Sequence, residues 1–530
     1  MKNKYLGYFI NLIFPAVVFG SVTGLITAAI ITLYKLCAKL IIEFSALGYS
    51  LLKEDLIFIP LVLIAIFAIS SGYSAIYKRI PNIKGGGIPT SIGILRGLIP
   101  FNFLKNIIGT FFLSLGTFLL GVPLGNEGPS VQMGTAIGKG SVFPLLKKHQ
   151  AWARYSMTGG ACAGFSVATG APVSGIIFAI EEAHQRVSPM IFIVASTSVT
   201  VSRIVTEIIS PFLGVSVSLF PKLDLPELSS SDIWIPLLIG ILLGIFAVLF
   251  LRFYSFVNRL SKRLHKIPDH IKIFSVLTLT LIAGLFSFSF ISTGHHLIVE
   301  LFDGGIAIYM LLIILIIRTV LTVFANSSNI TGGIFLPIMA IGAVFSALIA
   351  KAALALGLSS EYYTIILVLG ITACISGMMK MPLTAIAFAI EALSCYQNIL
   401  PVITVSAVSF MITELFEAKS INDSVLDNRL ADLNEGKKMK VFDAFVTVQD
   451  GSFAVGKQIR DIFWPANLFV LSVQHQEMNN AKVDKHGGSE IRSGDVLHIR
   501  YSTFDDVRTR EELTTIIGEQ EYKVTLVNKI

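Results

Sequence analysis

The chain has 530 residues, of which 54% are hydrophobic and only 14% are charged, and its mean hydropathy is +0.75. A soluble globular protein usually carries about a quarter charged residues, so most of this surface is expected to face lipid or other apolar helices. The net charge of +7 does not indicate a nucleic-acid partner, because the basic residues lie scattered at the ends of apolar segments. Cytoplasmic loops of membrane proteins have this pattern.

Apolar segments follow one another from residue 8 to residue 416. The first, at residues 8–36, follows Lys2 and Lys4 and is expected to be a membrane helix with these lysines in the cytoplasm. Stretches rich in Gly, Pro and Ser interrupt the pattern. Broken helices at membrane depth are tolerated only around a cavity or a binding site, so a transport pathway is expected. The longer apolar segments are residues 56–76, 107–122, 191–209, 235–251, 273–290, 310–324, 334–356 and 363–375, and the interruptions are 85–97, 125–138, 159–182 and 332–342.

The chain contains an internal repeat. The stretch from Pro172 to Glu181 recurs from Pro382 to Glu391, at an offset of 210 residues, with Pro, Phe, Ala, Ile and Glu in register. Two further motifs, Gly125-Asn-Glu-Gly-Pro129 and Gly333-Ile-Phe-Leu-Pro337, correspond at an offset of 208. Chance similarity between apolar segments is the alternative, but two motifs in the same order at nearly one offset favour duplication. Duplicated transporters commonly bind their ligand where the repeats meet, although the matches leave the relative orientation of the halves open.

The character of the chain changes after residue 416, where charged and polar residues become frequent. Short strands are predicted at residues 444–448, 468–473 and 496–501, with a helix at 457–463. We therefore divide the chain into a membrane domain, 1–435, and a small cytoplasmic α/β domain, 436–530.

Enzymatic, metal and redox chemistry find no support in the sequence. The chain has four cysteines, none in a CxxC pair, and no Cys/His cluster has the spacing of a zinc site. No nucleophile–base pair or phosphate loop stands out. We therefore expect neither an enzyme nor a bound cofactor.

Three glycine- and proline-containing segments have the composition of an anion site. Backbone N–H groups at helix N-termini bind anions without a full positive charge, glycine permits close approach of the backbone, and proline suits the first helical turn. Each segment alone is a weak signal, whereas three in one chain are a strong one. They are Gly85-Gly-Gly-Ile-Pro89, Gly125-Asn-Glu-Gly-Pro129 and Gly333-Ile-Phe-Leu-Pro337.

These segments resemble the three signature motifs of the CLC family of chloride channels and chloride–proton antiporters, written GSGIP, GREGP and GxFxP. The resemblance covers about residues 5–435 and includes the paired acids Glu181 and Glu182. It implies an α-helical polytopic membrane protein with the CLC fold: two inverted-topology halves, broken helices, and a homodimer with one pathway per subunit. It also implies a multi-pass protein of a bacterial plasma membrane with both termini in the cytoplasm.

The resemblance assigns roles to individual residues. Glu127 matches the gating glutamate, whose carboxylate competes with the anion, and Glu182 matches the internal glutamate that relays protons in antiporters. The alternative for Glu182 is a solvated residue at a helix end, and Glu391 is expected to be structural. The residues expected to contact the anion are Gly86, Gly87, Ile88, Gly128, Ile334, Phe335 and Asn422.

Two departures bear on the function. Gly86 replaces the serine of the first motif, and Asn422 stands where the family has a tyrosine, so two hydroxyl donors to the anion are missing. We expect a chloride/proton antiporter, voltage- or pH-sensitive and loosely coupled; a passive chloride or anion channel of the same fold is the alternative. Chloride is expected over fluoride, because the third motif is intact.

The tail resembles the C-terminal half of the regulator-of-potassium-conductance module (RCK_C, also called TrkA_C). The similar segments are residues 453–460, 468–473 and 494–497. Such domains dimerise and bind small regulators, including cyclic dinucleotides, so this kind of ligand is expected here. An assembly domain that binds nothing is the alternative.

Overall fold

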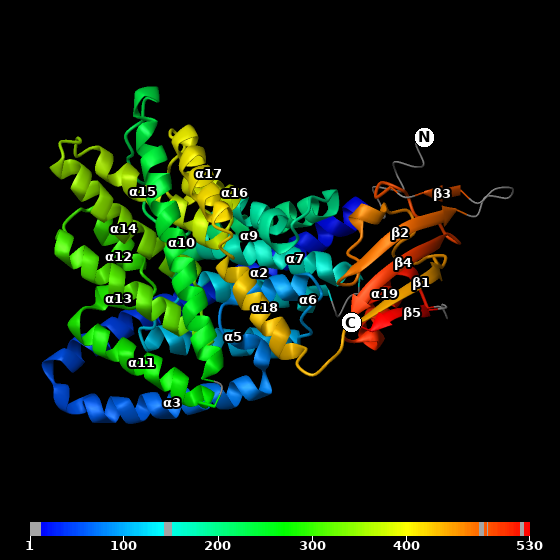
Figure 1. Ribbon diagram of the computed structural model, residues 1–530, viewed down its shortest axis with the longest axis horizontal. Coiled ribbons are helices and arrows are strands. Elements are labelled where there is room, and N and C mark those ends of the chain that lie inside the picture. The colour runs from blue at the N-terminus through cyan, green and yellow to red at the C-terminus, as the bar shows by residue number, and fades with distance from the viewer. Residues whose placement is uncertain are drawn as a thin grey trace.

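The computed structural model describes residues 12–142, 151–264, 266–475, 482–484, 486–519 and 524–529. Lys2 and Lys4 lie outside these residues. The chain forms a large helical domain followed by a small α/β domain at one end of it (Figure 1).

The helical domain runs from α2 to α18. Among the described helices, eight are long and apolar enough to cross a membrane (α2, α3, α9, α10, α11, α13, α14 and α15), and α5, α16 and α17 are apolar but shorter. The bounds are α2 (Phe14–Glu54), α3 (Ile59–Arg79), α4 (Gly87–Leu95), α5 (Phe103–Leu119), α6 (Glu127–Val142), α7 (Ala151–Thr169), α8 (Pro172–Phe178), the π-helix η4 (Ala179–Ala183), α9 (Pro189–Leu213), α10 (Trp234–Arg263), α11 (Asp269–Phe286), α12 (His295–Phe302), α13 (Ile308–Ser327), α14 (Phe335–Ala355), α15 (Tyr362–Met379), α16 (Pro382–Ala392), α17 (Ile399–Leu415) and α18 (Ile421–Leu433).

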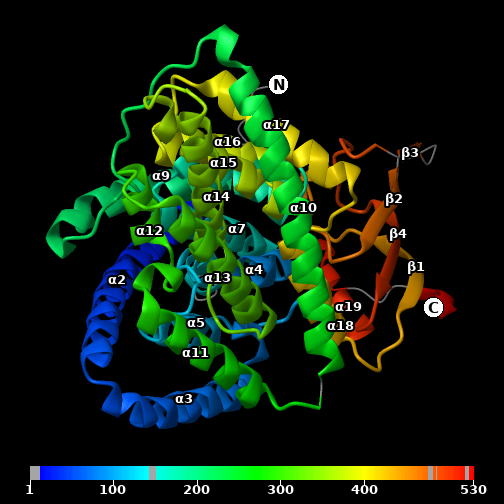
Figure 2. The same ribbon diagram turned by 60° about the vertical axis from the view of Figure 1, so that its left-hand side comes forward.

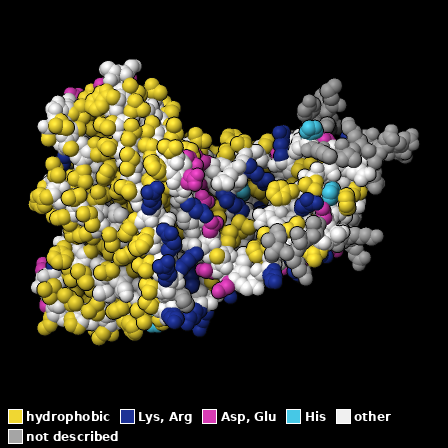
Figure 3. Space-filling model, in the orientation of Figure 1, with side chains coloured by type: hydrophobic (Ala, Val, Ile, Leu, Met, Phe, Trp, Pro, Cys, Tyr) yellow, Lys and Arg dark blue, Asp and Glu magenta, His cyan; other side chains and the backbone are white. Residues whose placement is uncertain are grey.

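Hydrophobic side chains cover the outside of this domain (Figure 3). Phe112 is 67% exposed and Phe286 is 77% exposed. A soluble monomer does not expose apolar area on this scale, so this surface faces lipid. Long helices α2 and α3 curve around one side of the shorter ones (Figure 2). The short helices α4 and α6 are mostly buried inside the domain.

The internal repeat is visible as two sets of matching helices. Helix α6 begins 208 residues before α14, and α8 and α9 begin 210 residues before α16 and α17. Proline at the first turn begins both α8 and α16, where its missing N–H costs nothing. The halves have inverted topology, as in the CLC fold.

The two halves are joined by a reciprocal pair of glutamates. Glu181 accepts hydrogen bonds from the amides of Leu383 and Thr384 at the start of α16, both at 2.8 Å. Glu391 accepts equivalent bonds from the first amides of α8, at 2.8 and 2.9 Å. Each carboxylate satisfies orphan amides at a helix N-terminus of the other half. The structural role expected of Glu391 agrees with these bonds.

The C-terminal domain is a five-stranded antiparallel sheet in the order β3-β2-β4-β1-β5. One face, including Phe442 and Tyr501, packs on α19. Phe453, between β1 and β2, contacts Trp152 of the membrane domain. The other face leaves Phe445 and Phe469 exposed. The bounds are β1 (Lys440–Thr447), η7 (Ile459–Asp461), β2 (Leu468–His475), β3 (Lys482–Asp484), β4 (Val496–Thr503), α19 (Asp506–Ile517) and β5 (Val524–Lys529).

The three predicted strands are present, with bounds that differ by up to four residues, but the predicted helix at 457–463 is wrong. Only the single turn η7 forms there. The backbone of this segment pairs with residues 487–491 instead: Ile491 N donates to Lys457 O at 2.9 Å and Arg460 N donates to Gly487 O at 2.9 Å. Pro465 follows closely, and the residue before a proline is disfavoured in a helix.

Candidate functional site

The three glycine- and proline-containing segments meet in the middle of the helical domain. Gly125 and Gly333 form an isolated antiparallel bridge, with N–O distances of 2.6 and 2.7 Å. The amide of Gly85 donates to Asn329 O at 2.8 Å, and the amide of Gly332 donates to Gly85 O at 3.4 Å. These bonds bring the N-termini of α4, α6 and α14 together at the interface of the two repeats.

Glycine is required where these backbones touch. A Cβ atom on Gly87 would overlap the carbonyl group of Gly128, and one on Gly128 would lie 2.8 Å from the Cα of Gly333. A larger residue would therefore push the helix N-termini apart. Their convergence leaves the positive ends of helix dipoles facing one region, which is the physical requirement for binding an anion.

Glu127 is the first residue of α6 and is fully buried. Within the described ranges, neither carboxylate oxygen has a hydrogen-bond partner. The backbone amides of Glu127 itself and of Leu336 lie close to the carboxylate, and Lys35 is near enough to attract it. The carboxylate therefore lies beside amides that an anion would seek, without being fixed to them.

Ile334 and Phe335 begin α14 and are buried. The Phe335 ring packs edge-on against Phe165 and Phe388, with ring centroids 5.3 and 5.4 Å away. Because Phe388 belongs to the second repeat and Phe165 to the first, this ring fixes the start of α14 between the halves. The expected anion-contacting residues Gly86, Gly87, Ile88 and Gly128 lie at the adjoining N-termini of α4 and α6.

Glu182 lies in the π-helix η4 and is 6% exposed. The amide Nδ2 of Asn422 donates to its Oε1 at 3.0 Å. Arg96 donates to the backbone carbonyls of Glu182 and Ala183, at 2.8 and 3.0 Å. Asn422, expected from the sequence to contact the anion, thus contacts the second glutamate, and Glu182 is not the solvated helix-end residue of the alternative interpretation.

Three polar residues near the site were missed by sequence reasoning. Lys35 is buried in α2 and donates to Val167 O at 3.0 Å; a lysine inside an apolar helix was a usable signal. Arg429 donates to Thr90, which follows the first motif segment, and it lies in the charged stretch after residue 416, where no site was predicted. The Oδ1 atom of Asn326 accepts from the Tyr254 hydroxyl at 2.6 Å, and no sequence pattern pointed to it.

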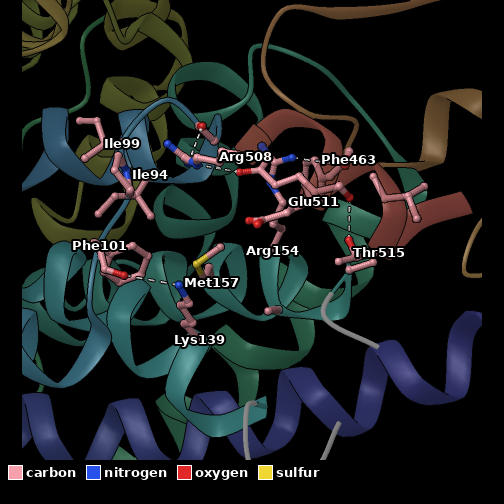
Figure 4. Close-up of a pocket in the computed structure, with 16 residues that line it drawn as sticks. Ile94, Ile99, Phe101, Lys139, Arg154, Met157, Phe463, Arg508, Glu511 and Thr515 are labelled. Atoms are coloured by element: carbon pink, nitrogen blue, oxygen red, sulfur yellow. Dashed lines mark hydrogen bonds and ion pairs between the residues drawn. The ribbon is translucent and has the colours of Figure 1, made fainter. Parts of the chain in front are cut away.

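The C-terminal domain contacts the helical domain close to Glu182. A cavity of about 370 Å³ lies between the two domains, lined by α6, α7 and α19 (Figure 4). Arg508 of α19 donates to Gly97 O at 2.9 Å, and Arg154 of α7 donates to Trp464 O at 2.8 Å. Within the described residues, no group of three or more His, Cys, Asp or Glu side chains could hold a metal ion.

The family model described as voltage gated chloride channel matches residues 62–414, which include all three motif segments and both glutamates. The chain belongs to this family, the CLC family. The match ends before the C-terminal domain begins.

Curated CLC relatives include two proteins named H(+)/Cl(-) exchange transporter ClcA. The protein from Vibrio cholerae is 29% identical over 390 residues, covering 70% of this chain and 81% of the relative. The protein from Citrobacter koseri is 29% identical over 434 residues, covering 79% and 89%.

Solved CLC structures share the fold. A slow cyanobacterial Cl⁻/H⁺ antiporter superimposes with a TM-score of 0.71 at 25% identity, covering 79% of this chain and 99% of that one. A CLC-type fluoride/proton antiporter superimposes with a TM-score of 0.59 at 21% identity, covering 76% and 96%. The second likeness concerns the fold alone.

Proposed function

We propose that this CLC protein is an antiporter that exchanges chloride for protons. The observation that carries the proposal is a pair of buried carboxylates in different surroundings. Glu127 lies among the helix N-termini, free of hydrogen bonds to the described residues, and Glu182 lies in a separate π-helix bonded to Asn422. π-Helices are frequent at functional sites. The proton-exchanging relatives support the same function.

In this mechanism Glu127 is the gate. An ionised carboxylate competes with chloride for the amides at the starts of α6 and α14, because both are anions. Protonation removes the charge, and chloride then takes the site. Glu182 delivers the proton from the side of the C-terminal domain, and Gly86, Gly87, Ile88, Gly128, Ile334 and Phe335 surround the chloride with backbone donors.

A flux experiment in proteoliposomes tests the proposal. With a chloride gradient alone, an antiporter drives protons uphill, and simultaneous pH and chloride recordings measure both fluxes. A passive anion channel is the second candidate, favoured by the absence of a hydroxyl at Gly86, which loosens the hold on the anion. Chloride flux with no proton movement would establish the channel and refute the antiporter.

We infer that the protein is a homodimer with its C-terminal domain in the cytoplasm. Helices α9 and α17 expose apolar side chains that a second subunit could cover. Figure 3 shows Lys and Arg side chains clustered between the apolar helical surface and the C-terminal domain. Cytoplasmic faces of membrane proteins are enriched in these residues. Light scattering of the solubilised protein tests the dimer, and labelling of a C-terminal cysteine from either side tests the orientation. The exposed side chains are Ile204, Ile208, Phe212, Leu400, Met411 and Leu415.

We also propose that the C-terminal domain is an RCK_C-like regulatory module. The resemblance depends mainly on the turn at Gly494 and Asp495. Gly494 has a φ of 84°, and Asp495 accepts hydrogen bonds from Arg492 N at 2.7 Å and from His475 Nδ1 at 2.9 Å. The exposed sheet face around Phe469 offers an apolar surface to a second copy. A cyclic dinucleotide at such a domain interface is the proposed ligand.

A further inference from the structure

The contact between the two domains is centred on residues 461–464, which we call the docking segment. Tyr155 of α7 donates its hydroxyl to the carbonyl of Asp461. Ser188 Oγ donates to the Asp461 carboxylate at 3.3 Å. Arg154 donates to the carbonyls of Trp464 and Phe463, at 2.8 and 3.3 Å. The docking segment is thus bonded to α7 and to the loop that follows η4.

The ring of Phe463 forms the apolar part of this contact. Its centroid lies 4.4 Å from the Tyr155 ring and 4.5 Å from the His184 ring. The guanidinium groups of Arg186 and Arg154 lie 4.7 and 5.7 Å from the same centroid. Aromatic and cation–π contacts together make such a ring an anchor. His184 and Arg186 follow Glu182 within four residues, so the anchor holds the chain immediately after the proton glutamate.

A second route leads from the docking segment to Glu182 through two arginines. Arg154 also donates to Leu95 O at 3.2 Å, and Figure 4 shows it between Phe463 and the end of α4. The next residue, Arg96, donates to the carbonyls of Glu182 and Ala183. The backbone of η4 is therefore tied to the C-terminal domain by a continuous series of hydrogen bonds.

The side chain of Glu182 is also linked to the C-terminal domain, through its hydrogen-bond partner. Its hydrogen-bond partner Asn422 is at the start of α18, and the other end of α18 is joined to β1 of the C-terminal sheet by residues 434–439. A displacement of the C-terminal domain would therefore move both the backbone and the carboxylate partner of Glu182. Within the described residues, no hydrogen bond joins the C-terminal domain to Glu127. The link to the anion site is indirect, through the end of α4, where Arg508 donates to Gly97 O at 2.9 Å.

We propose that the docking segment positions Glu182 for proton transfer, so that the C-terminal domain controls proton transport more strongly than chloride transport. This inference rests on the proposed antiport and deepens it. Arg96, Arg154 and Phe463 are positioning residues, since they act through Glu182. A ligand that changes the position of the C-terminal domain would then change the number of protons moved per chloride.

The test compares Phe463→Ala with two other variants in the full-length protein. Phe463→Ala removes the anchor ring, and Tyr155→Phe removes only the hydroxyl that bonds Asp461. Phe286→Ala is the matched control, because Phe286 is an exposed phenylalanine at the end of α11, outside the anion site, the proton route and the contact between the domains. Proton and chloride fluxes are recorded together in proteoliposomes. The proton-to-chloride ratio should fall in Phe463→Ala, fall less in Tyr155→Phe, and stay unchanged in Phe286→Ala.

Hydrogen exchange supplies a readout that does not depend on transport. Amides of residues 179–184 should exchange about tenfold faster in Phe463→Ala than in the parent, because loss of the anchor favours local opening. Unchanged exchange overturns the positioning role. Faster exchange with an unchanged flux ratio overturns the link to proton transport. If the parent moves no protons, the antiport proposal fails, and hydrogen exchange alone decides whether the docking segment holds Glu182.

Discussion

Replacing Gly86 by serine should strengthen chloride binding, and the backbone explains why. Gly86 has φ and ψ of −65° and 130°, which serine adopts without strain. A Cβ atom there would meet Pro89 Cδ at 3.5 Å, Asn326 Nδ2 at 3.6 Å and Gly332 O at 3.8 Å, all ordinary contacts. A serine at this N-cap position accepts, through its oxygen, from an amide of the first turn, here that of Ile88, because Pro89 has no N–H. That bond leaves the hydroxyl hydrogen free to donate, so it remains available to the anion.

The size of the effect follows from one hydrogen bond. A hydrogen bond to a charged group contributes about 1.5–3 kcal/mol, which corresponds to a chloride dissociation constant about 10- to 150-fold lower. Calorimetric titration of the purified protein with chloride measures this change. Gly86→Ala is the matched control, since it adds the Cβ atom without the hydroxyl and should leave the affinity unchanged.

If Gly86→Ser does not strengthen chloride binding, the side chain of Asn326 offers one explanation. Its Oδ1 accepts from Tyr254, which directs its Nδ2 group toward the space beside Gly86. If that amide already supplies the missing donor, Gly86→Ser gains nothing and Asn326→Ala weakens chloride binding. Unchanged affinity in both variants would refute the reasoning that a side-chain donor at this position matters.

Four further predictions address the gate, the proton route and the C-terminal domain. Glu127→Gln should abolish proton movement while chloride flux persists or rises, because the uncharged amide carries no proton and does not compete with chloride. Proton uptake at the native rate in this variant would refute the assignment of Glu127 as the gate. Glu182→Gln should stop proton flux and leave chloride flux largely intact, whereas equal loss of both would indicate a structural residue. Deleting the chain from Phe442 onward should change flux or its response to cyclic dinucleotides. If the truncated protein folds as a dimer and neither its flux nor its ligand response differs from the parent's, the regulatory role is refuted and the tail is an assembly domain only. Burial lowers the pKa of Lys457 to about 8. Between pH 8 and about pH 10.4, the ordinary pKa of lysine, the folded domain therefore binds fewer protons than the unfolded one. The unfolding free energy of the domain should rise with pH across this window. Lys457→Met should remove this pH dependence, as urea unfolding at pH 7 and pH 10 would measure.

The membrane domain was largely predictable because its constraints are repeated in the sequence. The 210-residue repeat predicted matching helices, and the motif segments predicted where helix N-termini converge. Backbone sterics enforce that convergence at Gly87 and Gly128, and glycine and proline are visible in a sequence. The resemblance to the CLC family added the orientation of the halves.

Contacts between distant side chains were not predictable. Nothing in the composition around Asn422 indicates that its amide bonds Glu182, because the pair is set by how α18 packs. The docking of Phe463 against Tyr155 likewise depends on the position of a whole domain. Arg429 was not predicted either: its Nε and Nη2 atoms are buried, although it lies in a charged part of the sequence.

The reciprocal bonds of Glu181 and Glu391 also constrain the history and synthesis of the chain. An ancestral half-length protein that paired with an inverted copy of itself could have made both bonds with a single glutamate, so gene fusion required no new contact. During translation, however, the first amides of α8 find their acceptor only after residue 391 has emerged. The first half is therefore left with unsatisfied amides at the start of α8 until the second half inserts.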